Sequence, residues 1–255
     1  MKNNSPFSRM LDLSGRVALV TGASRGIGKA IATALAEAGA QTIVHGSRMS
    51  PQLEEAVKSI TENSGNAKAV AADLGKRDEV DKLVAEIKNV DILILNASVQ
   101  SYQTVEDFTD EEFSRQYEIN LRASFELIKA FLPGMKKRRW GRLLTIGSIN
   151  QYKPSDRLAI YSTTKAALAN LTLNCARQYA EFGITANNIA PGVILTDRNE
   201  EVLADTGFQN KILDMIPAGR FGLPEDCAGL ALLLCSDAGS YITGTHIPVA
   251  GGMQL

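Results

Sequence analysis

Residues 21–28 read TGASRGIG, and they join a short apolar run at 17–20 to a longer segment of helical character. Three glycines, Gly22, Gly26 and Gly28, fall within these eight residues, in the spacing G-x-x-x-G-x-G. Glycine at such a junction costs about 0.5–1 kcal/mol relative to alanine at each position. Between a strand and a helix, a bare backbone lets a phosphate approach the free N–H groups and the positive end of the helix dipole. The stretch therefore predicts a dinucleotide site, with a turn selected only for tight packing as the alternative.

Short apolar runs alternate with longer amphipathic segments along the rest of the chain. Unbroken apolar runs are typical of strands that are covered on both faces, and strand–helix alternation implies parallel strands joined by right-handed crossovers. We expect an N-terminal tail over 1–13 and one α/β domain over 14–255, a doubly wound, Rossmann-type, seven-stranded parallel sheet with helices on both faces. The expected strands are 17–20, 42–44, 67–71, 92–95, 142–146, 185–189 and 246–249, and the expected helices are 26–38, 51–63, 77–88, 110–134, 159–181 and 224–235.

The composition excludes several classes of protein. The 255 residues carry a net charge of −1, so no basic field is available for nucleic acid or for an anionic membrane surface. The apolar stretches are too short to span a bilayer, and the N-terminus lacks the apolar core of a signal peptide. Three cysteines and two histidines without ligand-like spacing predict buried, reduced thiols, no metal site and a cytoplasmic protein.

The end of the second expected strand bears on the choice of cofactor. In this architecture a carboxylate there binds the adenine ribose hydroxyls of NAD. Here the position is Gly46, followed by Ser47 and Arg48, and Arg25 lies in the glycine turn. A hydroxyl and guanidinium groups suit a 2′-phosphate, which favours NADP(H) over NAD(H). Two solvated surface arginines are the alternative interpretation.

Tyr161 and Lys165 lie four residues apart, so on a helix they share one face. A free tyrosine has a pKa of about 10, and a neighbouring ammonium lowers it by stabilising the phenolate. Such a pair could exchange a proton with a substrate hydroxyl or carbonyl, unless it is only an exposed surface pair. Ser148 follows the fifth expected strand, at the sheet edge where ligands bind. Asn120 is a poor helix former inside an expected helix.

Together these residues resemble the short-chain dehydrogenase/reductase family over 14–255. The resemblance implies a nicotinamide-dependent oxidoreductase that interconverts a secondary alcohol and a ketone by hydride transfer. Ser98 and Ala250 depart from the family pattern, which has glycine and aspartate there. The motifs that carry the resemblance are TGASRGIG (21–28), Asp73-Leu74, Asn96-Ala97, Asn120, Ser148, YSTTK (161–165), Pro191-Gly192 and ITGTHIPVAGG (242–252).

The resemblance also implies roles for individual residues. Tyr161 is the expected general acid/base, Lys165 lowers its pKa and binds the nicotinamide ribose, and Asn120 supports a proton-relay water. Ser148 hydrogen-bonds the substrate oxygen, and Asn150 is expected beside Ser148 and Tyr161 at the substrate. The residues expected to bind the cofactor are Gly22, Ser24, Arg25, Gly26, Ile27, Gly28, Ser47, Arg48, Asp73, Leu74, Asn96, Ala97, Tyr161, Lys165, Pro191, Gly192, Ile194 and Thr196.

Polar side chains near the expected site favour a small polar substrate, such as a sugar, a polyol or a small ketone. They are equally consistent with solvated loops. The segment 196–218 is less regular than the rest and is either a lid or a surface excursion. The polar residues in question are Gln100, Tyr102, Asn150, Gln151 and Arg157.

A 3-oxoacyl-acyl-carrier-protein reductase is the alternative function. Glu126 and Phe182 disfavour it, because they stand where such enzymes carry basic residues for an acidic carrier. A non-catalytic dinucleotide-binding sensor is the second alternative, disfavoured by the intact acid/base pair. The resemblance further implies a homodimer or homotetramer that pairs through helices in 110–134 and 159–181.

Overall fold

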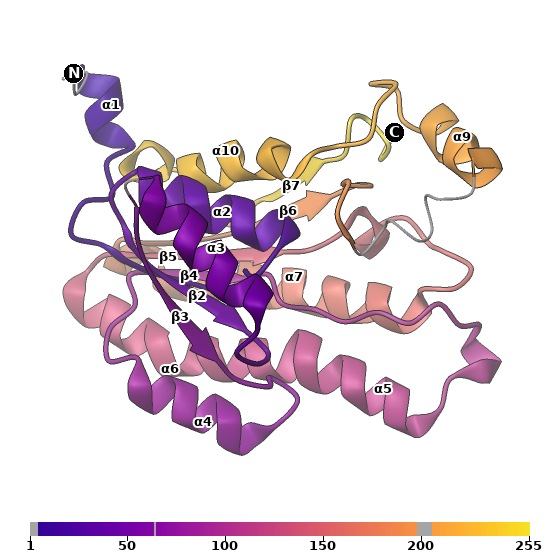
Figure 1. Cartoon of the computed structure of the whole chain (residues 1–255), viewed down its shortest axis with the longest axis horizontal. Helices are drawn as coiled ribbons and strands as arrows, with labels where there is room; N and C mark the ends of the chain where they lie inside the picture. Colours follow the sequence, from indigo (N-terminus) through magenta and orange to yellow (C-terminus); the bar gives the residue numbers. More distant parts are fainter. Residues whose placement is uncertain (1–4, 64, 198–205) are drawn as a thin grey trace.

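The computed structural model describes residues 5–63, 65–197 and 206–255, and in them seven parallel strands form one sheet (Figure 1). The strand order is β3-β2-β1-β4-β5-β6-β7, which confirms the expected Rossmann-type fold class. The order reverses between β1 and β4, and ligands bind outside the carboxyl ends of strands at such a switch point. The strands are β1 (Val17–Val20), β2 (Gln41–Gly46), β3 (Asn66–Ala71), β4 (Ile92–Leu95), β5 (Gly141–Ile146), β6 (Ile184–Pro191) and β7 (His246–Val249).

Helices cover both faces of the sheet and enclose two separate cores (Figure 1). Side chains alternate along each strand, so Leu19 packs in one core while Ala18 and Val20 pack in the other. The core of Leu19 lies under α4 (Arg77–Glu86), α6 (Ala123–Arg138) and α7 (Ala159–Tyr179). The core of Ala18 and Val20 lies under α2 (Gly26–Glu37), α3 (Pro51–Glu62) and α10 (Pro224–Cys235).

The expected helix over 110–134 is present, but it is not α-helical throughout. It consists of α5 (Asp110–Tyr117), a π-helical turn η2 (Glu118–Arg122) and α6, which runs on to Arg138. A π-turn holds one more residue than an α-turn, and such turns are frequent at functional sites. The sequence prediction missed the π-turn because it has no periodicity of its own over five residues.

Two segments flank this frame. The N-terminal tail is described from residue 5 and contains α1 (Pro6–Met10), after which Leu13 is buried and donates its N–H to the Ala38 carbonyl at 2.7 Å. Part of the segment 196–218, residues 198–205, lies outside the described residues, so whether it forms a lid stays open. Helix α9 (Thr206–Asp214) follows residues 198–205 within the same segment. The remaining short helical turns are η1 (Val105–Asp107), η3 (Ile149–Gln151), η4 (Ala180–Phe182) and η5 (Asp237–Gly239).

The three cysteines lie in the cores as free thiols. Burial raises the pKa of Cys175 to about 11 and the pKa values of Cys227 and Cys235 to about 12. These thiols are therefore protonated at neutral pH and pack as small apolar groups. Within 5–63, 65–197 and 206–255, no helix combines the length and the apolar character needed to cross a membrane.

Candidate functional site

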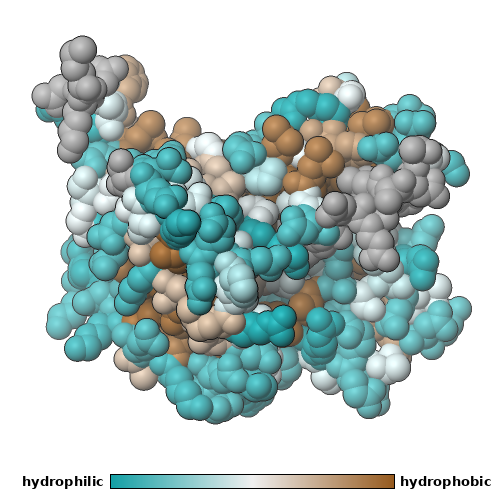
Figure 2. All heavy atoms as spheres, viewed as in Figure 1, coloured by the Kyte–Doolittle hydropathy of each residue, from teal (hydrophilic) through white to brown (hydrophobic). Residues whose placement is uncertain are grey.

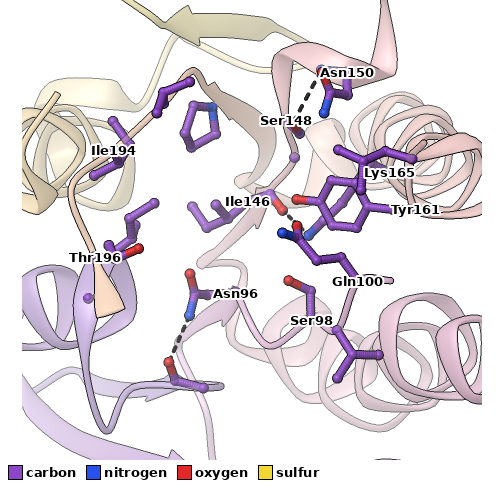
Figure 3. Close-up of a pocket in the computed structure, with 18 of the residues that line it drawn as sticks. Asn96, Ser98, Gln100, Ile146, Ser148, Asn150, Tyr161, Lys165, Ile194 and Thr196 are labelled. Carbon is purple, nitrogen blue, oxygen red and sulfur yellow. Dashed lines mark hydrogen bonds between the residues drawn. The ribbon is translucent and has the colours of Figure 1, made fainter. Parts of the chain in front are cut away.

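A cavity of about 860 Å³ opens at the carboxyl edge of the sheet (Figure 3). Its walls come from the ends of β1, β2, β4, β5 and β6 and from the start of α7, segments that are far apart in the sequence. Of the residues to which the family resemblance assigns a role, Asn120 and Arg48 do not line it. The expected residues that do line it are Gly22, Ser24, Arg25, Gly26, Ile27, Gly28, Ser47, Asp73, Leu74, Asn96, Ala97, Ser148, Asn150, Tyr161, Lys165, Pro191, Gly192, Ile194 and Thr196.

The glycine turn between β1 and α2 has the geometry that a phosphate site requires. Gly22 has a φ of +63°, and a Cβ there would lie 2.8 Å from the Ala97 Cα atom. Gly26 also has a positive φ, of +56°, and a Cβ at Gly28 would overlap the Gly22 carbonyl oxygen. Helix α2 begins after Arg25 without a side-chain cap, so the N–H groups of its first turn are available to an anion.

Two polar side chains, the partly buried Asn96 and the buried His45, hold this turn in place. The Asn96 Nδ2 group donates to the carbonyls of Thr21 and Gly22, at 3.0 and 2.9 Å (Figure 3). His45 accepts the Gly22 N–H on Nδ1 at 3.2 Å and donates Nε2–H to the Ala72 carbonyl at 3.0 Å. Because a carbonyl only accepts, the contact with Ala72 sets the tautomer of His45. Burial lowers the His45 pKa to about 4, so the ring is neutral at pH 7.

The other end of the glycine turn faces the ends of β2 and β3. Ser47 lines the cavity there, whereas Arg48 is exposed beside it. Arg25 is at the cavity but forms an ion pair with Asp197 at 3.2 Å. Asp73 lines the same end, and its Oδ1 accepts the Gly75 N–H at 3.0 Å.

Tyr161 and Lys165 lie on the face of α7 that meets β5. Both are buried, and Lys165 is only 1% exposed. The Lys165 Nζ group donates to the Ile146 carbonyl at 2.7 Å and lies 5.6 Å from the centroid of the Tyr161 ring. In Figure 3 the Tyr161 hydroxyl points into the cavity, on the same side as Ser148. A phenol, a cation and a hydroxyl thus share one wall, a combination suited to proton transfer.

Asn120 lies behind this wall, in the π-turn η2. Its Oδ1 accepts the Val99 N–H at 2.8 Å, and its Nδ2 donates to the Val99 carbonyl at 2.8 Å and to Thr164 Oγ1 at 3.1 Å. The side chain therefore fixes the loop after β4 against α7. Asn120 itself does not line the cavity, and its expected support of a proton-relay water stays a prediction.

The loops bring further residues to the end of the cavity beyond Tyr161. Gln100 and Tyr102 line it as expected, but Gln151 and Arg157 do not. Arg157 instead donates to the Tyr102 carbonyl at 3.0 Å. Sequence reasoning missed the other residues at this end, since no motif marks them and the crossover loops alone bring them there. They include Lys153, Asp156, Lys211, Ile212, Met215 and Met253.

This end of the cavity is both polar and apolar. An apolar cluster of Ile149, Ile216, Phe221 and Met253 packs beside it. Figure 2 shows a mostly hydrophilic face on which brown side chains gather between α10 and α9. Across the described parts of the chain, no group of three or more His, Cys, Asp or Glu side chains is placed to hold a metal ion.

Known proteins share this fold and much of the sequence. The family model of the short chain dehydrogenases matches residues 16–207. The 3-oxoacyl-[acyl-carrier-protein] reductase FabG of Rickettsia felis is 36% identical over 247 residues, which cover 96% of this chain and 100% of that protein.

Two solved structures also match. A 3-oxoacyl (acyl-carrier-protein) reductase of Agrobacterium tumefaciens C58 with NADP bound has 38% identity and a TM-score of 0.93, and covers 98% of both chains. A protein of Beutenbergia cavernae named as an NAD(P) dependent gluconate 5-dehydrogenase, with bound NADP, has 34% identity and a TM-score of 0.91, with 96% of this chain and 98% of that chain covered.

His45 should make the free energy of unfolding depend on pH. Its pKa is about 4 in the folded chain and 6.5 in an unfolded one, so between these values only the unfolded chain binds the proton. The stabilising contribution is complete above pH 6.5 and is lost as the pH falls towards 4, by about 3 kcal/mol in total. Urea unfolding of the wild type and of His45→Gln at several pH values measures the effect.

The wild type should lose more stability than His45→Gln over this range. His246, the only other histidine, and the carboxylates titrate in both proteins and cancel in the comparison. Parallel curves for the two proteins would show that His45 does not carry the proton linkage.

Proposed function

The chain belongs to the short-chain dehydrogenase family, and we propose that it is an NADP(H)-dependent oxidoreductase that interconverts a secondary alcohol and a ketone on a small polar substrate. The observation that carries the proposal is the buried pair of Tyr161 and Lys165 at the wall of a cavity whose other end is a glycine turn. A protein that only bound the dinucleotide would not require a buried cation beside a phenol that faces the cavity.

Tyr161 is the proposed acid/base. When bound, the nicotinamide supplies or accepts the hydride. In the reducing direction the Tyr161 hydroxyl donates its proton to the carbonyl oxygen of the substrate, and in the oxidising direction the phenolate takes it back. The Lys165 ammonium, held by the Ile146 carbonyl, favours the phenolate through its charge. Ser148 Oγ accepts the Asn150 N–H at 3.2 Å, so its own hydrogen is available to the substrate oxygen.

Several features support NADP(H) as the cofactor. The glycine turn and the uncapped start of α2 fit a pyrophosphate. The last position of β2, where a carboxylate would bind the adenine ribose of NAD, is Gly46. Ser47 lines the cavity there, and Arg48 follows it in the sequence. Both solved structures described above hold NADP. The proposed 2′-phosphate site therefore consists of Ser47 and Arg48, with Arg25 close by in its ion pair with Asp197.

The residues at the end of the cavity beyond Tyr161 favour a small polar substrate. Gln100, Asn150, Lys153 and Asp156 place amide groups and both signs of charge around the proposed reaction centre. A site built from hydrogen-bonding groups rejects ligands that leave those groups unpaired. The gluconate 5-dehydrogenase named above is a protein of similar sequence whose named substrate is of this class.

Glu126 and Phe182 lie away from the cavity and do not bear on a carrier-bound substrate at the reaction centre. Neither residue lines the cavity, and Phe182 follows α7 at the end opposite Tyr161. Moreover, the Lys136 Nζ group lies 4.1 Å from the centroid of the Phe182 ring, so positive charge is present there. A 3-oxoacyl-acyl-carrier-protein reductase, the name carried by two of the similar proteins, therefore remains the alternative.

A homodimer or homotetramer stays a prediction. Phe113 on α5 and Phe125 on α6 are exposed, and both helices belong to the segment 110–134 that the family resemblance expects to pair. An interface between copies of the chain would cover these rings.

Tyr161→Phe should abolish turnover and leave NADPH binding within about twofold of the wild type. The ring keeps its packing, while the lost proton transfer lowers the rate by about 10²–10⁴-fold. Steady-state rates and fluorescence titration with NADPH measure the two effects. Tyr241→Phe, at a fully exposed tyrosine outside the cavity, is the matched control and should behave as the wild type. Retention of more than about a tenth of the wild-type rate by Tyr161→Phe would exclude the acid/base role.

A substrate panel with both cofactors tests the remaining parts of the proposal. NADPH should bind at least about tenfold more tightly than NADH, because a charge-assisted contact to phosphate contributes about 1.5–3 kcal/mol. Among gluconate and other sugar acids, polyols, small ketones and acetoacetyl-carrier protein, the highest kcat/KM should belong to a small polar compound. Reduction of the carrier-bound compound as the best substrate, at about 10⁴ M⁻¹s⁻¹ or above, would establish the alternative function. Equal affinity for the two cofactors would contradict the reading of Ser47 and Arg48.

A further inference from the structure

A chain of buried polar groups runs beneath Ser148, outside the cavity. It begins at Gln151 in η3 and passes through Asn188 on β6 and Thr145 on β5 to Thr172 on α7. Thr145, Thr172 and Asn188 are fully buried, and none of the four residues is among those that line the cavity. Buried polar groups of this kind need partners, and the proposed reaction does not use any of them directly.

In this hydrogen-bonded series each side chain accepts from the group on its Ser148 side and donates to the group on its Thr172 side. The Thr145 carbonyl can only accept, so the Asn188 Nδ2 group must face β5, where it donates to that carbonyl at 3.3 Å and to Thr145 Oγ1 at 2.8 Å. This orientation turns Asn188 Oδ1 towards Gln151, whose Nε2 donates to it at 3.0 Å. The Oε1 atom of Gln151 is thereby directed at the Ser148 N–H, which it accepts at 3.4 Å.

The hydrogen-bond directions at the Thr172 end of this series are also fixed. Thr172 Oγ1 donates to the Leu168 carbonyl at 2.8 Å, so it accepts the hydrogen of Thr145 Oγ1, 2.9 Å away. Each bond polarises the next, and the low dielectric of the interior strengthens the series. The amide orientation of Gln151 therefore follows from backbone carbonyls on β5 and α7.

Ser148 is held at the near end of this chain. Its backbone is extended, with φ −163° and ψ 152°, and it caps η3 by accepting the Asn150 N–H on Oγ. Gly147, just before it, has no room for a side chain, because a Cβ there would overlap Gln151 Oε1 and would lie 2.8 Å from Asn188 Oδ1. The position of the Ser148 hydroxyl in the cavity thus depends on contacts made on the other side of its backbone.

We propose that Gln151, oriented by Asn188, is a positioning residue that sets the Ser148 hydroxyl for the substrate oxygen. The inference rests on the proposed function, in which Ser148 contacts that oxygen. Gln151 acts through the backbone of Ser148 and does not touch the substrate. Loss of its hydrogen bonds to Ser148 and Asn188 displaces the hydroxyl, and displacements of about 1 Å at a reacting centre can lower rates by about 10²-fold.

The first test is Gln151→Met, which keeps the length of the side chain and removes the hydrogen bonds of its amide group, including those to Ser148 and Asn188. The probe is gluconate with NADP⁺ or acetoacetyl-coenzyme A with NADPH, whichever the wild type turns over faster. Rates are divided by the number of NADPH-binding sites, so that unfolded protein does not contribute. We expect kcat/KM to fall about 10- to 100-fold while NADPH affinity stays within about twofold. Gln178→Met, at an exposed glutamine of α7, is the control and should match the wild type.

A double mutant separates positioning from a general structural role. If Gln151 acts through Ser148, Gln151→Met should have no further effect on kcat/KM in a Ser148→Ala background. A residue with an independent structural role would lower the rate by the same factor in both backgrounds. The proposal would be overturned if the two substitutions lowered kcat/KM by independent factors that multiply in the double mutant. It would also be overturned if the kcat/KM of Gln151→Met stayed within about twofold of the wild type.

Gln151→Glu adds a pH signature. A protonated glutamic acid has the same shape as glutamine and can donate to Asn188 Oδ1 while accepting the Ser148 N–H, whereas the carboxylate cannot donate. The ratio of Gln151→Glu activity to wild-type activity should therefore rise as the pH falls from 8 to 5. A ratio that does not change with pH would contradict the assigned hydrogen bonds.

A readout that needs no substrate keeps this inference separate from the proposed function. In the NADPH-bound protein, amide hydrogen exchange of the peptide 147–151 should be at least about tenfold faster in Gln151→Met and unchanged in Gln178→Met. Unchanged exchange in Gln151→Met would overturn the positioning role. If the wild type binds NADPH but turns over neither probe, the substrate assignment fails, while the exchange experiment still decides the role of Gln151.

Discussion

The arrangement of the proposed reaction centre depends on the buried ammonium of Lys165. Lys165 is only 1% exposed, and its Nζ group donates to the last carbonyl of β5 at 2.7 Å. This bond fixes the first turns of α7 at the carboxyl edge of the sheet, which brings Tyr161 to the cavity wall. A buried charge is unfavourable for folding in itself, since desolvation can exceed what its partners return. We interpret its presence as a requirement of the reaction.

A second principle of the site is that polar side chains fix the backbone of the cavity wall. His45 fixes the backbone of Gly22, Asn120 fixes that of Val99, and Gln151 that of Ser148. Each of these side chains binds main-chain groups, so the wall is defined by the backbone of segments from different strands. Interactions of this kind keep reacting groups in place without touching the ligand, and they restrict the orientations that the backbone can adopt.

Much of the frame could be predicted from the sequence. Unbroken apolar runs and strand–helix alternation give the parallel sheet, and topology then brings the residues after β1, β4 and β5 to one edge. The spacing of Tyr161 and Lys165 gives a shared helical face. The π-turn around Asn120 could not be predicted, because no residue pattern distinguishes it from an α-turn. The same limit applies to side-chain direction: Gln151 was expected at the cavity and instead faces Asn188, a contact across 37 positions of the chain.

The measurement that tests the account most directly is the combination of thermal stability and turnover in Lys165→Met. Methionine fills the same space without a charge, so the melting temperature should stay the same or rise. Turnover should fall by at least about 100-fold, because the phenolate of Tyr161 loses its neighbouring cation. A folded Lys165→Met that retains wild-type turnover would contradict the central role of this charge in the reaction. A loss of stability by several kcal/mol would instead assign the buried ammonium to the fold.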